Sequence, residues 1–168
     1  MRKRELEVTD ARKIKEILDK CRVLHLGLSE EDQPYVVPMS YGYTYEGDTL
    51  VLYLHGGMEG YKYEVIKKNP KVSFAMECDV VPFSGKAACQ YGITYSSIMG
   101  KGMAEIVEEV QEKEQALSIL MKTQTGKDFE FNERLVSIVN VIKITVTEYS
   151  AKHRPLPPAL AAGSEETV

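Results

Sequence analysis

Apolar and polar residues alternate with two different periods along this chain, and the first is helical. Near the start, apolar residues fall at intervals of three and four positions: Ile14, Ile17, Leu18 and Cys21. Such spacing places side chains on one face of a helix, so we predict a helix over residues 10–20. Thr9 or Asp10 is expected to cap it, because a short side-chain oxygen accepts hydrogen bonds from the free N–H groups of a first turn. Similar patterns predict helices over residues 58–68 and 109–122.

Elsewhere the pattern indicates β-strands. Runs rich in Val, Leu, Ile and Tyr predict six strands, over residues 22–29, 34–45, 49–55, 71–78, 95–107 and 137–149. The first three are joined by short turns, which indicates antiparallel neighbours, because parallel strands need long crossovers. Residues 79–92, which contain Pro82 and Gly85, predict an irregular connection. Six strands with helices inserted singly indicate a mainly β fold, a closed or nearly closed antiparallel barrel.

Length and composition set the expected domain boundary. A chain of 168 residues has the size of one domain and can bury a core without disulfides or metals. From Lys152 onward it is rich in Pro, Ala, Ser and Glu, a composition that buries too little apolar surface to become ordered. We therefore predict one domain over residues 1–151 and a disordered tail over residues 152–168.

Charge and hydropathy disfavour several classes of function. A net charge of −4 is unlike that of proteins that grip nucleic-acid backbones, which present a basic face. No apolar run reaches the roughly 20 residues needed to cross a bilayer, and the basic start is followed by acidic residues rather than by an apolar signal segment. The cysteines show neither metal-binding spacing nor a CxxC pair. We expect a cytoplasmic protein with reduced thiols, no metal site, and no nucleic-acid or membrane partner.

The segment from Leu54 to Lys62 has the features of an anion site. A predicted strand ends at His55, Gly56 and Gly57 carry no side chains, and a predicted helix follows with Lys62 near its start. The free N–H groups of a first turn, the helix dipole and an ammonium group together favour a phosphate. An ordinary strand-to-helix turn would have the same sequence pattern, and the spacing matches neither a P-loop nor a dinucleotide-binding motif.

Two further residues allow a functional and a structural interpretation. His55 ends a predicted strand beside the anion segment, where it could shuttle protons near neutral pH; it could equally be a half-buried histidine bonded to a backbone carbonyl. Pro38 lies in the middle of a predicted strand and lacks an N–H donor, so we expect that strand at a sheet edge or bulge. The backbone groups that such an edge leaves unpaired could bind a planar heterocycle. Alternatively, the segment is an ordinary edge strand with no ligand.

The sequence resembles the pyridoxamine-phosphate-oxidase-like flavin-binding split barrels, and within them the group named for 5-nitroimidazole antibiotic resistance. The resemblance covers about residues 1–150. It rests on matches in this order: Met1-Arg2-Lys3, Val8-Thr9-Asp10, Pro34 to Met39, Tyr53-Leu54-His55, Gly60, Lys62, Lys67 to Pro70, Ala88-Cys89, Tyr95, Ser97 to Gly100 and Thr125 to Phe129. It implies a six-stranded antiparallel split β-barrel that forms a homodimer with two flavin sites at the subunit interface.

The resemblance also implies the residues that contact the flavin, which is FMN or, in the alternative, FAD. They fall in three segments: Val37, Pro38, Met39 and Ser40; His55, Gly57, Met58, Gly60 and Lys62; Ser97, Ile98, Met99 and Gly100. The second segment would hold the phosphate, and His55 would be the catalytic residue beside the flavin. The chain departs from the family at Gly56-Gly57, where Ser-Ala is usual, and at Tyr61, where an arginine is usual. The missing arginine removes one phosphate partner, and the opened loop would give room to a larger flavin such as FAD.

The activity implied by the resemblance is a flavin-dependent oxidoreductase that reduces the nitro group of 5-nitroimidazole-type compounds to an amine. The redox chemistry belongs to the cofactor, and the protein holds the flavin against a small-molecule electron acceptor. Two alternatives keep the fold and change the function. One is a non-catalytic flavin-binding protein for storage or sensing, and the other is a haem-binding split barrel.

Overall fold

A computed structural model describes residues 4–161, so Met1, Arg2 and Lys3 of the family resemblance and residues 162–168 of the expected tail lie outside the described part. The strands are β1 (Glu7–Val8), β2 (Leu24–Glu30), β3 (Gln33–Met39), β4 (Tyr41–Glu46), β5 (Thr49–Gly56), β6 (Lys71–Phe83), β7 (Gly92–Val107) and β8 (Asn140–Arg154). The helices are α1 (Ala11–Lys20), α2 (Tyr61–Lys68), α3 (Val110–Thr125), α4 (Glu133–Val136) and α5 (Pro158–Ala161), with 3-10 turns at Arg4–Leu6 and Ala88–Gln90.

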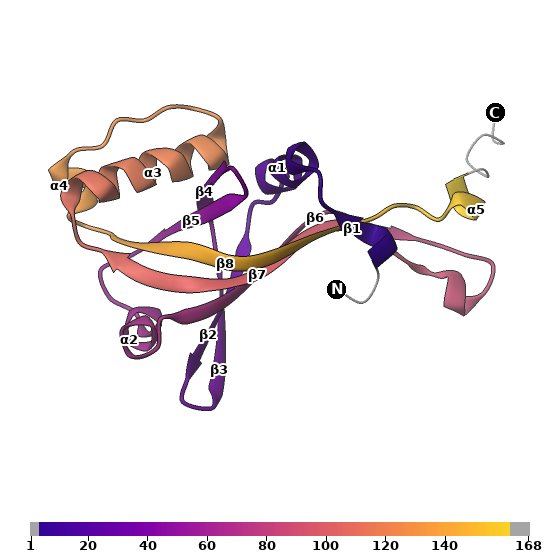
Figure 1. Ribbon diagram of the computed structural model, residues 1–168, viewed down its shortest axis with the longest axis horizontal. Helices are drawn as coiled ribbons and strands as arrows, with labels where there is room; N and C mark the ends of the chain where they lie inside the picture. Colours follow the sequence, from indigo (N-terminus) through magenta and orange to yellow (C-terminus); the bar gives the residue numbers. More distant parts are fainter. Residues whose placement is uncertain (1–3, 162–168) are drawn as a thin grey trace.

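The strands form one antiparallel sheet that curls around a core. Its order is β3-β2-β6-β7-β8-β5-β4, and β1 pairs with the end of β8. Strands β3 and β4 lie at opposite ends of this order, although only Ser40 separates them in the chain. Because one residue spans only about 3.3–3.6 Å, the two edges of the sheet must meet at Ser40. The sheet therefore rolls into a barrel, as Figure 1 shows for the strands around β7 and β8.

The inner face of the rolled sheet holds the main hydrophobic core. Alternate residues of the long β3–β4 segment point inward, and Met39, Tyr41 and Tyr43 are all buried. Fully buried leucines from β2 and β5 face them: Leu24, Leu26, Leu50, Leu52 and Leu54. Side chains of a strand alternate between two faces. Because this alternation continues unbroken from Met39 to Tyr41, the same face of the chain points into the core in β3 and in β4.

Helix α1 covers one end of the barrel as the apolar spacing predicts. Its buried residues are Ile14, Ile17 and Leu18. The side chain of Asp10 accepts hydrogen bonds from the N–H groups of Arg12 and Lys13, each at 3.0 Å. Asp10 is thus the N-cap, one of the two residues expected in that role, and the prediction of this helix is confirmed.

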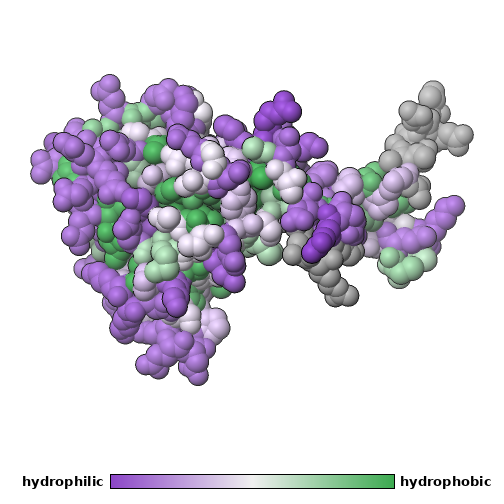
Figure 2. Space-filling view, in the orientation of Figure 1, coloured by the Kyte–Doolittle hydropathy of each residue, from purple (hydrophilic) through white to green (hydrophobic). Residues whose placement is uncertain are grey.

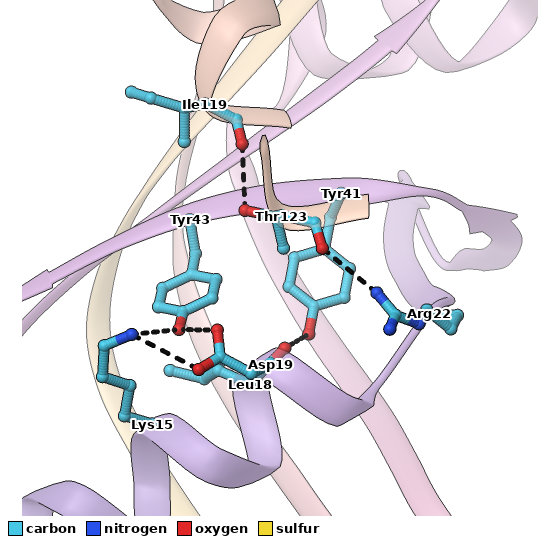
Figure 3. Close-up of polar contacts among 8 residues, drawn as sticks. All are labelled: Lys15, Leu18, Asp19, Arg22, Tyr41, Tyr43, Ile119 and Thr123. Carbon is cyan, nitrogen blue, oxygen red and sulfur yellow. Dashed lines mark hydrogen bonds and ion pairs between the residues drawn. The ribbon is translucent and has the colours of Figure 1, made fainter. Parts of the chain in front are cut away.

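Two tyrosines of β4 fasten α1 to the barrel, as Figure 3 shows. The buried hydroxyl of Tyr41 donates to the backbone oxygen of Leu18 at 2.6 Å, and that of Tyr43 donates to Asp19 Oδ1 at 2.5 Å. Arg22 then reaches across to the end of α3, where its guanidinium donates to the backbone oxygen of Thr123 at 3.1 Å. The bonds to Leu18 and Thr123 give carbonyls in the last turns of two helices partners that they would otherwise lack.

Helix α3 packs directly on β4, backbone against backbone. A Cβ atom built on Gly42 would lie 2.3 Å from the Cα atom of Leu120, a separation that real atoms do not tolerate. Only glycine therefore fits at this crossing. In the view of Figure 1, α3 and α1 lie above β7 and β8, whereas α2 lies below them.

The fold class is confirmed, and the differences from the predicted elements are local. The predicted strand over residues 34–45 is two strands, because its halves pair with different neighbours, β2 and β5. Strand β6 continues through a bulge between Cys78 and Val81 into the segment expected to be irregular. It continues because β7 begins earlier than predicted and supplies partners for it. With β1 added, the six expected strands become eight.

Strand β8 runs past Lys152, where we expected the tail to begin. Lys152 pairs with Glu7 of β1 and with Ser97 of β7, and the ladder extends to Arg154. Backbone pairing on both sides holds this segment despite its composition. In Figure 1 the far ends of β6, β7 and β8 project from the barrel together with α5. Within residues 4–161, no helix has the length and apolar character needed to cross a membrane.

Replacing Gly42 with alanine tests the contact between α3 and β4. The added methyl group would collide with the α3 backbone, so we expect the free energy of unfolding, measured in urea, to fall by about 2–3 kcal/mol. Gly57→Ala is the matched control, because a Cβ atom there meets nothing within 4 Å, and its effect should stay below about 1 kcal/mol. Equal stabilities of the two variants would contradict the close approach.

Candidate functional site

The turn between β5 and α2 is open and rich in glycine. Strand β5 ends at Gly56, and Gly60, the residue before α2, has a φ of 152°, a conformation that side-chain-bearing residues rarely adopt. The side chain of Asn140, at the start of β8, donates to the backbone oxygen of Met58 at 2.7 Å and holds the turn against the sheet. The backbone of this turn is therefore accessible and fixed, as a ligand-binding loop requires.

Lys62 places an ammonium group over this turn. A Cβ atom built on Gly56 or on Gly60 would lie 3.2 Å from its Nζ atom, so the ammonium lies between the two glycines. The same atom is 4.4 Å from the centroid of the Tyr63 ring. Among residues 4–161, Lys62 forms no ion pair. Its charge is available to an anion at the start of α2, where the helix dipole acts in the same direction.

Two buried polar atoms in the described part of the chain lack a hydrogen-bond partner, and both belong to this region. They are Nδ1 of His55 and the hydroxyl oxygen of Tyr63. Buried polar side chains in native proteins are nearly always paired, because an unpaired group loses its hydration without compensation. Each of these two side-chain atoms is therefore a candidate for contact with a ligand.

His55 and Tyr63 approach the end of β5 from opposite faces. His55 pairs directly with Val141 of β8, so its side chain lies on the face that carries Val141 and the smaller hydrophobic cluster under α3. The Tyr63 hydroxyl lies at Gly56, one residue further along, and hence on the other face. Burial lowers the pKa of the His55 imidazole below its ordinary value of 6.5, because burial disfavours the charged form. The imidazole is therefore neutral at pH 7.

The junction of β3 and β4 lies beside His55. The ladder between β4 and β5 ends with Tyr41 opposite Leu54, so the next position places Ser40 next to His55. Met39 points into the core, whereas Pro38 is exposed on β3, a strand at the end of the sheet order. The expectation that Pro38 occupies an edge strand is confirmed. The structure thus brings Val37 to Ser40 near the turn before α2.

The third predicted segment, Ser97 to Gly100, lies apart from the other two. It is in the middle of β7, and strands β2 and β6 separate it from β3. Ile98 is fully buried in the main core, so its side chain faces away from solvent. Met99 points outward with 56% of its surface exposed. Through Val141 of β8, it is Val107 of β7 that lies level with His55, so Ser97 to Gly100 are at least seven residues along β7 from that level.

The outer face of the sheet carries a shallow groove of about 610 Å³ across β2, β3, β6, β7 and β8. Its lining residues are His25, Gly27, Val36, Ser73, Phe74, Ala75, Met99, Gly100, Lys101, Glu148, Tyr149 and Ser150. Val36 is 62% exposed at one side of this groove. Figure 2 shows green and pale residues gathered over the middle of the sheet with hydrophilic side chains around them. An exposed apolar surface of this kind is typical of an interaction face.

Tyr63 is not among the site residues predicted from the sequence, and Tyr61, which stands where an arginine is usual, faces away from the site. The hydroxyl of Tyr61 donates to the carboxylate of Glu30, which also accepts from the ammonium of Lys68. These bonds tie α2 to the end of β2, so Tyr61 does not extend toward the glycine turn. Tyr63 resembles an ordinary core residue in the sequence, and no motif marks it. Only its position against Gly56 identifies it.

A model of the family described as pyridoxamine 5′-phosphate oxidase matches residues 10–153 of the chain. The chain belongs to this family. The resemblance to the pyridoxamine-phosphate-oxidase-like barrels is thereby confirmed. None of the curated proteins that were compared matches the chain.

Solved structures of three proteins resemble this member of the family. A candidate 5-nitroimidazole antibiotic resistance protein of Bacteroides thetaiotaomicron is 31% identical, with a TM-score of 0.72, over 88% of this chain and 86% of the other. A flavocytochrome of Azotobacter vinelandii is 21% identical, with a TM-score of 0.74, over 94% and 73%. An FAD- and haem-binding protein of Mycobacterium smegmatis is 16% identical, with a TM-score of 0.73, over 94% and 80%. The last two share the fold.

The lowered pKa of His55 predicts that stability depends on pH. The unfolded chain protonates His55 at a higher pH than the folded chain does, so the free energy of unfolding falls as the pH drops below 6.5. In His55→Gln this contribution is absent, and the fall between about pH 7 and about pH 5 should be smaller. Urea denaturation at several pH values measures the difference. Identical pH profiles of the two proteins would show that the folded chain does not disfavour the protonated form of His55.

Proposed function

We propose that this protein binds a flavin, FMN, at the turn between β5 and α2 and reduces small nitro compounds of the 5-nitroimidazole type. Membership of the family supports a flavin. The similarity, at 31% identity, to a candidate 5-nitroimidazole resistance protein supports the substrate class. One observation of the chain itself carries the proposal furthest. The Lys62 ammonium and the buried Tyr63 hydroxyl, neither of which has a polar partner among residues 4–161, meet at the glycine turn that precedes α2.

The residues present fit the phosphate end of a flavin. Lys62 supplies a positive charge, the first turn of α2 supplies free N–H groups, and Gly57 leaves open space above the backbone. The departures from the family pattern do not remove every phosphate partner, since Tyr63 brings a hydroxyl to the position where Gly56 has none. The chain therefore has enough donors for a phosphate monoester.

The flavin ring would lie along the free edge of β3 at the junction with β4. Strand β3 ends the sheet order, so the backbone groups of Val37 to Ser40 that face away from β2 are unpaired within the described sheet. Pro38 contributes an exposed, rigid ring and no donor on this edge. A flat heterocycle with donors and acceptors on its rim matches such an edge.

A bound flavin supplies the transfer of electrons to the nitro compound. The chain has to hold both reactants and to provide protons, because conversion of a nitro group to an amine consumes protons together with electrons. His55 would act as a proton relay: its imidazole is neutral at pH 7, so it has to take up a proton from solvent before it can pass one on, and its Nδ1 atom has no partner among residues 4–161. Ser40 beside it would orient the imidazole.

We also propose that the protein works as a homodimer and that the site is complete only with two copies. Met99 and Val36 expose apolar side chains on the outer groove. The register of β7, β8 and β5 places Ser97 to Gly100 far along the strands from the same chain's glycine turn. A second copy on this face would cover the apolar groove and bring its own β7 toward the first copy's flavin.

Purification without added cofactor tests the flavin directly. We expect a yellow protein that releases FMN on denaturation, identified by absorbance near ~450 nm and by mass.

The activity is tested with the reduced protein. A 5-nitroimidazole should reoxidise it in the absence of oxygen, and His55→Gln should slow this step more than it weakens flavin binding. In the purification experiment, release of FAD would show that the cofactor is FAD and not FMN, and a Soret band would show that the protein binds haem. Flavin binding without any nitro reduction would favour a storage or sensing role.

Replacing Met99 with glutamate tests the dimer. A charge in the apolar groove has to be desolvated on association, so Met99→Glu should be a monomer where the wild type is a dimer, measured by sedimentation. Ile138→Glu is the matched control, because Ile138 is 67% exposed and lies outside the groove. A monomeric wild type, or a dimeric Met99→Glu variant, would contradict this interface.

A further inference from the structure

The unpaired hydroxyl of Tyr63 needs an explanation that packing does not provide. Tyr63 is 4% exposed, and its hydroxyl oxygen is buried without a hydrogen-bond partner. A phenylalanine would fill the same space without the cost of a desolvated hydroxyl. A partner that arrives from outside the chain would offset this cost.

The hydroxyl occupies the place of a missing side chain. A Cβ atom built on Gly56 would lie 2.6 Å from the Tyr63 oxygen, closer than two such atoms can approach. A serine at position 56 could not coexist with this tyrosine in its present position. The glycine at position 56 therefore leaves the space that the Tyr63 hydroxyl occupies, and this hydroxyl is the side-chain donor at that point of the turn.

The Lys62 ammonium lies over the Tyr63 ring, near the hydroxyl. Its Nζ atom is 4.4 Å from the centroid of the Tyr63 ring and 3.2 Å from the Cβ position of Gly56. A lysine side chain is flexible, and an anion attracts its ammonium more strongly than an aromatic ring does. Movement of the ammonium toward an anion above the turn would uncover the Tyr63 hydroxyl beneath it.

The hydroxyl can act only as a neutral donor here. Burial raises the pKa of the Tyr63 phenol above its ordinary value, so the group keeps its proton at neutral pH. A neutral donor beside an ammonium suits a group with several acceptor oxygens and a negative charge, such as a phosphate monoester.

We propose that Tyr63 is a phosphate-binding residue, whose hydroxyl donates to the ligand phosphate in place of the side chain that Gly56 lacks. This inference rests on the proposed flavin site and assigns the second donor of its phosphate end. Lys62 supplies the charge and Tyr63 supplies a directed hydrogen bond. The phosphate belongs to FMN or, in the alternative, to the pyrophosphate of FAD.

Titration of the flavin-free protein with FMN, FAD and riboflavin, followed by flavin fluorescence, tests the proposal. Riboflavin has the same ring system without a phosphate. Tyr63→Phe should weaken FMN binding by about 10- to 100-fold, the range for a hydrogen bond to a charged group, and leave riboflavin binding unchanged. Lys62→Gln should behave in the same way. An equal loss for FAD would show that its pyrophosphate uses the same donor, whereas a loss for FMN alone would identify the monoester as the ligand.

A second-site variant separates a phosphate contact from a general defect. In Tyr63→Phe the space at position 56 is vacant, so adding Gly56→Ser should restore FMN affinity by returning a hydroxyl to the turn. Gly56→Ser alone should weaken binding, since its Cβ atom would collide with the Tyr63 oxygen. Without flavin, Tyr63→Phe should melt at the same temperature as the wild type or higher, because it removes an unpaired buried hydroxyl. A structural role for the hydroxyl would lower the melting temperature.

Two outcomes would overturn the inference at different levels. If the wild type binds FMN no better than riboflavin, the phosphate site itself is wrong, and the role of Tyr63 falls with it. If the wild type prefers FMN and Tyr63→Phe retains the full preference, the flavin site stands and Tyr63 is not part of it.

Discussion

The architecture depends on a constraint of chain length: one residue, Ser40, joins the two strands that form opposite edges of the sheet. An extended residue spans only a few ångströms, so the edges cannot separate and the sheet has to close. Closure creates an inside, where Met39, Tyr41 and the leucines of β2 and β5 form the core. It also fixes where helices can lie. Helix α1 is held by the hydroxyl of Tyr41, and α3 rests on the bare backbone of Gly42.

The candidate site follows from the same closure. Ser40 adjoins His55 because the β4–β5 ladder continues past Tyr41, and β5 leads into the glycine turn before α2. Barrel strands on one side and a helix on the other hold the turn. Such rigid surroundings can keep His55 and Tyr63 with unsatisfied polar atoms, a state that a flexible loop would relieve by rearrangement. The unpaired atoms are thus maintained by the stability of the rest of the fold.

The sequence predicts what depends on local patterns and misses what depends on distant partners. The stripe ending at Cys21 and the Asp10 cap predict α1 almost to the residue, since both act within one helix. The split of the 34–45 segment at Ser40 could not be predicted, because each half is defined by the strand that pairs with it. The pairing of Lys152 with β7 is equally long-range. At the site, Lys62 and the glycines form a recognisable motif, whereas Tyr63 gains meaning only from its position beside Gly56 in space.

The single-residue joint also limits how chains of this fold can diverge. A surface loop absorbs an insertion by bulging, but Ser40 lies between two strands whose side chains keep a common alternation. One added or deleted residue would exchange the inward and outward faces of β3 relative to β4. Met39 would then leave the core, or Tyr41 would. Length variation among related proteins should therefore accumulate in turns such as the one between β3 and β2, while the number of residues across this joint stays constant.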